Sequence, residues 1–307
     1  MSDIKPLKKW NVSKCNDFSY IFSGCKLLSD VAPLGNWNFS NQKIINVTPS
    51  LSDYIIVSIS LSNFFCDCSK LNNISSLEKW DVSNCNYFSS MFRNCSSLSN
   101  IKGLEKWNVL NSKKLASMFY NCSSLLDITP LENWKVWSCE DFSCMFYNCS
   151  KLSNIKGLEN WDVINAKNFS YMFYNCSSLT NITPLEYWNV INSNNFSYMF
   201  NNCSSLSDIS ALQNWKVSKC NYFSSMFSSC SLISSVSSLE KWDVSNCISF
   251  SYMFYNCPKL SDIKGLEKWN VSNCKNFENM FKNCHSSLDF KPLKKWNASK
   301  ALMKKIK

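Results

Sequence analysis

The sequence predicts a repeat solenoid, in which short turns of chain stack on one another around a shared core. Three observations predict this fold. Tryptophan recurs every 27 residues with one exception, cysteine stands 15 residues after nine of these tryptophans, and apolar residues stand three apart between them. A fixed period of roughly 20 to 50 residues is typical of arrays whose single units cannot bury their apolar faces alone. We therefore expect one elongated domain over residues 1–307, with about eleven turns.

The tryptophan lattice defines the turn. Its members are Trp10, Trp37, Trp80, Trp107, Trp134, Trp161, Trp188, Trp215, Trp242, Trp269 and Trp296. Every interval is 27 residues except the one between Trp37 and Trp80, which is 43, or 27 plus 16. We count positions within a turn from its lattice Trp as position 0. Each Trp is expected to stack on the equivalent Trp of the next turn, about 5 Å away if neighbouring turns pair as strands.

The residues after each Trp follow in a fixed order. Position 2 is mostly Val, position 8 mostly Phe, positions 11 and 12 mostly Met-Phe, and position 15 is Cys in all ten copies. Leu, Ile and Leu then dominate positions 18, 21 and 24. Apolar residues three apart cannot form one strand, because strand faces alternate with a period of two. The spacing predicts a coil that bends repeatedly and points every third side chain inward.

The stretch LEKWDVSNCNYFSSMFRNCSSLSNIKGL, residues 77–104, resembles the BspA-type leucine-rich repeat, in the variant found in bacterial and protist surface proteins. The likeness covers nearly the whole chain, and the Cys at position 5 departs from it, since that family more often has Val there. The resemblance implies a leucine-rich-repeat-like solenoid of 27-residue turns. We expect short β-strands around "SLSNIKGL" and "WDVS" in each turn, and a short helical turn near "FSSMFYNC".

Two segments depart from the lattice. Residues 41–57 hold the 16 additional residues and are predicted to form an inserted loop. A hairpin that caps one edge and a translated intron are the alternatives. Residues 297–307 are rich in Lys, and we expect them to form a basic C-terminal cap on the core. A short basic helix could also contact an anionic membrane, but closure of the core is the favoured interpretation.

Charge and composition exclude several classes of protein. The net charge of +10 is concentrated in the last nineteen residues, at +6, and the first nine, at +2, and the only Arg is Arg93. This is unlike the basic stripe of a nucleic-acid-binding protein, so we expect no nucleic acid partner. No apolar run reaches the roughly 20 residues of a membrane helix, and the N-terminus has no secretory core. We predict a cytoplasmic location, with the cell surface, which the resemblance implies, as the alternative.

The cysteines are predicted to be a column of free, buried thiols. Ten equivalent Cys residues have no unique disulfide partners, and free Cys behaves as a small buried apolar residue. N-x-S/T sequences also fall just before the column, at Asn94, Asn121 and equivalent positions. Glycans would crowd these repeated sites, which again favours a reducing compartment without glycosylation.

The sequence indicates no catalytic, metal or cofactor site. It has a single His, His285, and no CxxC pair, whereas a zinc site needs four converging ligands. Its five Gly do not form a phosphate-binding loop, and the Glu column at position 25 is expected to be a solvated charged face. We therefore predict a protein that is not an enzyme and binds no cofactor or metal.

A candidate binding surface lies where consecutive turns break the pattern together. Position 3 is Ser in seven copies but is Leu110, Trp137, Ile164 and Ile191 in four consecutive turns. If Val at position 2 points inward, strand alternation points position 3 outward. The result is an exposed apolar stripe, which marks an interaction surface, with Trp137 as its anchor. The alternative is that these side chains turn inward, because position 5 is small in three of the turns (Ser112, Ala166 and Ser193).

Tyrosines at position 10, including Tyr171 and Tyr198, occur in overlapping turns and are predicted to extend the binding surface. The function that we predict is a non-enzymatic scaffold that presents a rigid repeat surface to another protein. A cell-surface adhesive or structural repeat protein is the alternative.

Overall fold

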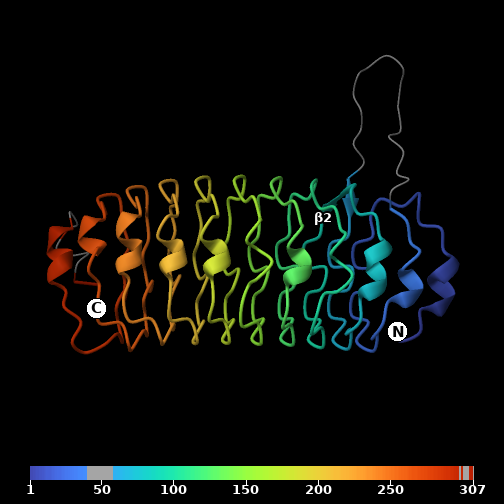
Figure 1. The fold of residues 1–307 in the computed structure, drawn as a ribbon, viewed down its shortest axis with the longest axis horizontal. Helices are drawn as coiled ribbons and strands as arrows, with labels where there is room; N and C mark the ends of the chain where they lie inside the picture. The colour runs from blue at the N-terminus through green and yellow to red at the C-terminus, as the bar shows by residue number, and fades with distance from the viewer. Residues whose placement is uncertain (40–57, 297–298, 300–303, 307) are drawn as a thin grey trace, which may run out of the picture.

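The computed structural model describes residues 1–39, 58–296, 299 and 304–306. The chain winds into a single row of stacked turns, with its two termini near opposite ends of the row (Figure 1). The predicted repeat solenoid is therefore the fold that the structure shows. Residues 41–57 and most of residues 297–307 lie outside the described residues, so the inserted loop and the basic cap stay predictions.

Neighbouring turns pair in parallel and in register. At position 7, Asp141 pairs with Asn168, and Asn168 pairs with Asn195. At position 20, Asn154 pairs with Asn181 in the same way. Extended strands are few among the described residues: β1 (Ile59–Ser60) pairs in parallel with β2 (Cys85–Tyr87), and the other pairings are single bridges. Every turn thus contacts only the turns before and after it.

Short 3-10 helices form the corner just before the lattice Trp. In the described part of the chain they are η1 (Lys5–Lys9), η2 (Ala32–Leu34), η3 (Ser75–Lys79), η4 (Thr129–Leu131), η5 (Thr183–Leu185), η6 (Ser210–Leu212), η7 (Ser237–Lys241), η8 (Leu266–Lys268) and η9 (Lys291–Lys295). Two turns have no such helix, and in these Gly103 and Gly157 adopt φ of 107° at the corner. Gly265 takes the same position with φ of 95°, and there η8 begins one residue later.

The helical turn expected near "FSSMFYNC" is not there, so this prediction was wrong. Positions 10 and 14 are left-handed throughout the row, with φ of 58° at Ser90 and 60° at Asn94. The backbone N–H groups of this segment instead donate alternately to the next turn and to their own turn. The Phe92 N–H donates to the Met118 carbonyl of the next turn at 2.9 Å, whereas the Met91 N–H donates to the Phe88 carbonyl of its own turn at 3.1 Å.

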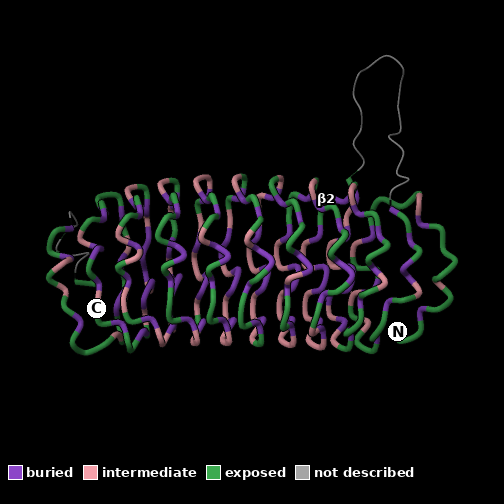
Figure 2. The backbone as a smooth tube through the Cα atoms, in the orientation of Figure 1, coloured by how far each residue is buried: buried purple, intermediate pink, exposed green. Residues whose placement is uncertain are grey.

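Stacked aromatic rings fill the core. From Trp80 to Trp296 the lattice Trp rings are nearly parallel, with centroids of neighbours 6.1 to 6.5 Å apart. Each indole also donates to the turn before it, as Trp107 Nε1 does to the Leu77 carbonyl at 2.8 Å. The Phe residues at position 12 form a second buried stack beside the first, for example Phe119 on Phe146. Buried residues alternate with exposed ones along each turn (Figure 2).

The cysteine column does more than fill space. Nine thiols, from Cys68 to Cys284, donate to the carbonyl of the position 12 Phe in the preceding turn, with sulfur–oxygen distances of 3.1 to 3.3 Å. Burial raises the pKa of both Cys176 and Cys230 to about 12. These thiols therefore stay protonated near neutral pH and can act as donors. The sequence predicted their burial but not this bond.

Candidate interaction surface

The apolar stripe at position 3 faces outward. Trp137 is 48% exposed, and Leu110, Ile164 and Ile191 are half-buried. The Val residues that precede them, at position 2, are buried. Position 5 is fully buried in all four turns, as Ser112, Cys139, Ala166 and Ser193. The small residues at position 5 thus fill the core themselves, and the alternative in which the stripe turns inward was wrong.

Hydrogen bonds fix the stripe as a straight line along the row. The Asn165 side chain donates to the Trp137 carbonyl at 2.8 Å, and the Asn192 side chain donates to the Ile164 carbonyl at 2.9 Å. Each bond joins position 4 of one turn to position 3 of the turn before. Strand β2, which covers positions 5 to 7 of its own turn, lies near the upper edge of the row in Figure 1. The stripe is therefore presented by a backbone that neighbouring turns hold in place.

Charge is distributed unevenly beside the stripe. Lys113, Lys114 and Lys135 are exposed next to Leu110 and Trp137. Farther along, Lys167 pairs with Glu140 of the preceding turn at 2.5 Å, and this hydrogen bond lowers the pKa of Glu140. In its own turn, the residues beside Ile191 are uncharged, since Asn189 and Asn192 occupy positions 1 and 4. Lysines nevertheless lie at both ends of the stripe, because Lys216 and Lys219 of the next turn are exposed beside the Ile191 end.

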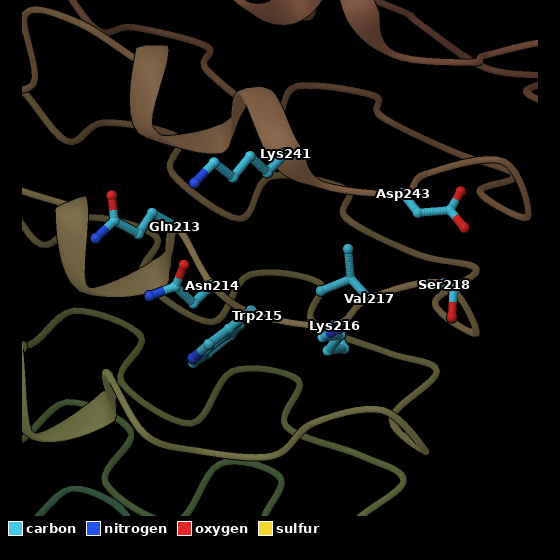
Figure 3. A pocket seen from close by; sticks show the side chains of 8 residues that line it. All are labelled: Gln213, Asn214, Trp215, Lys216, Val217, Ser218, Lys241 and Asp243. Atoms are coloured by element: carbon cyan, nitrogen blue, oxygen red, sulfur yellow. The ribbon is translucent and has the colours of Figure 1, made fainter.

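A shallow pocket of about 320 Å³ lies on the turn that follows Ile191. Figure 3 shows its lining, which is Gln213, Asn214, Trp215, Lys216, Val217, Ser218, Lys241 and Asp243. Lys219, beside this pocket, donates to the Asn192 side chain at 2.7 Å, which places the pocket next to the end of the stripe. Ser218 is the first Ser at position 3 after the stripe, so the apolar surface ends here.

The tyrosines form a separate cluster. Tyr120, Tyr147 and Tyr174 stack with centroids 4.3 and 4.5 Å apart, and the Arg93 guanidinium lies 4.0 Å from the Tyr120 centroid. Tyr171 and Tyr198 stack at 4.4 Å, and burial raises the pKa of Tyr171 to about 12. Tyr171 joins the two stacks through Tyr174 at 5.7 Å. Within the described residues no ring contact links this cluster to Trp137, so the predicted site residues lie in two groups.

A ladder of side-chain amides beside the tyrosines was not predicted. At position 14, Asn94 donates to Asp67 at 2.6 Å and Asn121 donates to Asn94 at 3.0 Å. Asn148, Asn175 and Asn202 continue the series. All of these residues are left-handed, a conformation that Asn, Asp and Gly tolerate better than other residues. The recurrence of Asn, Asp and Gly at this position was the signal that could have revealed the ladder.

The remaining candidate residues, His285 and the Glu column, bond to nearby residues of the chain. His285 is exposed, and its Nδ1 lies 2.8 Å from the Ser287 hydroxyl. The Glu column makes bonds that were not predicted: Glu240 pairs with Lys268 of the next turn at 2.7 Å, and Glu105 accepts the Gly103 N–H at 2.6 Å. In the described part of the chain, no three His, Cys, Asp or Glu residues are placed to hold a metal ion. No described helix is long and apolar enough to cross a bilayer.

Comparison with known proteins identifies a family. The family described as "Mycoplasma protein of unknown function, DUF285" matches residues 2–50, 59–180, 127–237, 153–264 and 209–306. A search of the curated proteins gave no match.

Several solved structures are similar in part. A leucine-rich repeat protein from T. pallidum is 16% identical, covering 62% of this chain and 71% of its own, with a TM-score of 0.34. A leucine-rich cell surface protein from Faecalibacterium prausnitzii is 14% identical, covering 94% and 78% of the two chains, with a TM-score of 0.39. A leucine-rich repeat protein from Bacteroides ovatus is 16% identical, covering 88% and 80%, with a TM-score of 0.27.

Proposed function

This chain belongs to the DUF285 family, and we propose that it is a non-enzymatic scaffold that binds another protein through the stripe of Leu110, Trp137, Ile164 and Ile191. The observation that carries this proposal is the exposed Trp137 at the centre of an apolar line. The exposed half of the Trp137 side chain contributes nothing to the stability of the fold. A partner that buries it gains a large apolar contact.

The rigid surroundings of the stripe support the proposal. Its backbone is held by cross-turn hydrogen bonds to the Trp137 and Ile164 carbonyls, and every turn rests on the stacked aromatic core. A surface that is already ordered loses little conformational entropy on binding. Four apolar side chains can therefore contribute most of their burial energy to affinity.

Tyr171 and Tyr198 enter the proposal as a second contact area. Both side chains are partly exposed in their stack, and a tyrosine can offer a partner its hydroxyl group for hydrogen bonding as well as its ring. Substitution of both residues by Ser, the residue at position 10 of neighbouring turns such as Ser117 and Ser225, separates their contribution from that of the stripe.

We place the protein in the cytoplasm, with the cell surface as the alternative that its resemblance to surface repeat proteins implies. Two features support a reducing compartment without glycosylation. The thiol column supplies hydrogen-bond donors, which oxidation would remove. The Asn residues of the N-x-S/T sequences belong to the amide ladder. Labelling of intact cells with a membrane-impermeant amine reagent tests this, since surface exposure of the lysines would contradict it.

Photocrosslinking tests the proposed function. A photoreactive phenylalanine is placed at Trp137 in one variant and at Ser245, the same position of a turn outside the stripe, in the control. Expressed in cells of the natural host, the first variant should give discrete protein adducts that the second does not give. Adding Leu110→Ser and Ile191→Ser should suppress them. Equal adducts from both positions, or none from Trp137, would contradict the proposal.

A further inference from the structure

We infer that the stripe is built for an amphipathic α-helix of another protein, which lies along the long axis of the solenoid and carries acidic residues towards an end of its apolar face. This inference rests on the proposed function and specifies the chemistry of the partner. It follows from the spacing of the stripe, from the state of its backbone and from the charges at its ends.

The spacing of the stripe matches a helix. Bridges from Lys114 to Asp141, Asp141 to Asn168 and Asn168 to Asn195 hold its turns in parallel register. Equivalent residues therefore stand about 4.8 Å apart, and the outermost two are about 14 Å apart. Helix residues i, i+3, i+7 and i+10 stand at about 0, 4.5, 10.5 and 15 Å along the axis. Alternate residues of an extended strand are about 6.6 Å apart, so by the third contact they no longer match the spacing of the stripe residues.

Most of the backbone groups of the stripe are already hydrogen-bonded within the chain, which disfavours pairing with a partner strand. The N–H groups of Leu110, Ile164 and Ile191 donate to the Asx side chains two residues earlier, at 3.1 to 3.3 Å. The carbonyls of Trp137 and Ile164 accept from Asn side chains of the next turn. Strand addition depends on free main-chain groups, whereas a helix in a groove is recognised through its side chains. The stripe presents side chains.

Charge favours acidic residues at an end of the partner helix. Lys113, Lys114 and Lys135 are exposed at the Leu110 end and form no ion pair with other described residues. In the middle, Lys167 is neutralised by Glu140. The Ile191 turn has no charged side chain at positions 1 to 7, but Lys219 of the next turn donates to the Asn192 side chain at 2.7 Å and brings a positive charge to that end as well. Acidic residues of the partner, or the negative end of its helix dipole, are therefore favoured over the lysines at either end of the stripe.

A second copy of this chain does not supply the helix from its described residues, because their helices are 3-10 helices of three to five residues. An apolar face that follows the stripe needs at least eleven residues of α-helix. We therefore assign the helix to a different protein.

Peptide display tests the inference. A random library of 20-residue peptides on phage is selected on the full chain and counter-selected on a variant with Leu110→Ser, Trp137→Ser, Ile164→Ser and Ile191→Ser. Ser is the residue of the other seven turns, so this variant should fold, which its circular dichroism and urea midpoint verify. We expect enriched peptides with apolar residues three and four apart and with Asp or Glu towards one end. Their binding should weaken at least about tenfold on the serine variant.

The outcomes separate the inference from the proposed function. Stripe-dependent peptides with alternating apolar residues, or with no helical spacing, overturn the helix inference and leave the scaffold function standing. Failure to enrich any stripe-dependent peptide counts against both. For the selected peptides, Lys113→Gln with Lys114→Gln should weaken binding about threefold to tenfold, and less at high salt. If this double variant changes nothing, the acidic chemistry assigned to the partner at the Leu110 end is wrong.

Discussion

The buried cysteine at position 15 has two structural roles, as a small apolar side chain and as a hydrogen-bond donor. Its sulfur fills a small apolar space, and its hydrogen satisfies a carbonyl of the preceding turn, as Cys176 does for Phe146 at 3.2 Å. That carbonyl already accepts the Cys149 N–H of its own turn at 3.2 Å. The thiol therefore occupies the second lone pair of a buried oxygen, which would otherwise face an apolar interior.

This arrangement predicts that alkaline pH destabilises the protein. An unfolded thiol ionises near pH 8.5 to 9, whereas burial raises the pKa of Cys176 in the folded chain to about 12. Above the unfolded pKa, the folded state binds more protons than the unfolded state. Each such thiol then lowers the free energy of unfolding by about 1.4 kcal/mol per pH unit until its folded pKa is reached.

Urea unfolding in reductant between pH 7 and 10.5 measures this dependence. Cys176→Ala should unfold earlier at pH 7 and should show a shallower loss of stability above pH 9 than the parent chain. Cys15→Ala, at an exposed position, serves as the matched control and should keep the parent slope. A parent midpoint that does not move between pH 8 and 10.5 would show that the thiols are not buried donors.

At the scale of the element, the turn is defined by two left-handed residues and by the bonds that they allow. Position 14 combines that backbone with the amide ladder, so one Asn meets two requirements. Asn148 has φ of 56°, donates to Asn121 and accepts from Asn175. Other turns of the row carry Gly24, Asp67 and Ser229 at the same position. These residues also have short or absent side chains.

We predict that Asn148→Ala destabilises the chain by about 2 to 3 kcal/mol, because alanine is strained in the left-handed region and the ladder is cut. Asn148→Gly should cost about 1 kcal/mol less, since glycine removes the strain and loses only the ladder. The midpoint and slope of urea unfolding report both values. Asn133→Ala, at an exposed position, should have almost no effect, and equal losses from Ala and Gly would show that φ is not the cause.

The sequence predicted the row of turns because its core residues are locally repetitive. Trp, Phe, Cys and Leu recur at fixed positions, and stacking equivalent residues is the simplest way to bury them together. The outward direction of Trp137 also followed from alternation after Val136. The helical turn was misplaced because the left-handed state at position 10 has no strong sequence signature when Ser90 and Tyr171 share that position, and because the recurrent Asn at position 14 was not recognised as a left-handed residue. The cross-turn bonds of thiols and amides depend on register, which a single turn does not reveal.

At the scale of the whole molecule, the turns are interchangeable in their contacts and distinct only at their surfaces. Each Trp indole, thiol and amide bonds to the turn before it, and the same set of bonds recurs along the row. Stability in such an array is close to a sum over turns and their interfaces. The surface can therefore diversify in a few turns, as the stripe does, without changing the core.

This modularity predicts that one whole turn can be removed. Deleting residues 215–241, which number 27, joins Asn214 to Trp242 and leaves every core column in register. The shortened chain should remain folded and monodisperse in size-exclusion chromatography, with its near-ultraviolet dichroism from stacked indoles retained. Deleting residues 215–235 instead shifts the columns and should abolish cooperative unfolding. If both deletions behave alike, register is not what holds the turns together.

The cross-turn hydrogen bonds run along the long axis of the row, from Trp80 to Trp296. Tension applied to the two ends of the chain is carried by all the interfaces in series, and a terminal turn, which has a neighbour on one side only, detaches first. A turn that detaches releases 27 residues, or about 90 Å of extended chain, and leaves the next turn as the new end. Under load the molecule would lengthen in equal steps, and its unfolded fraction would record how far it had been stretched.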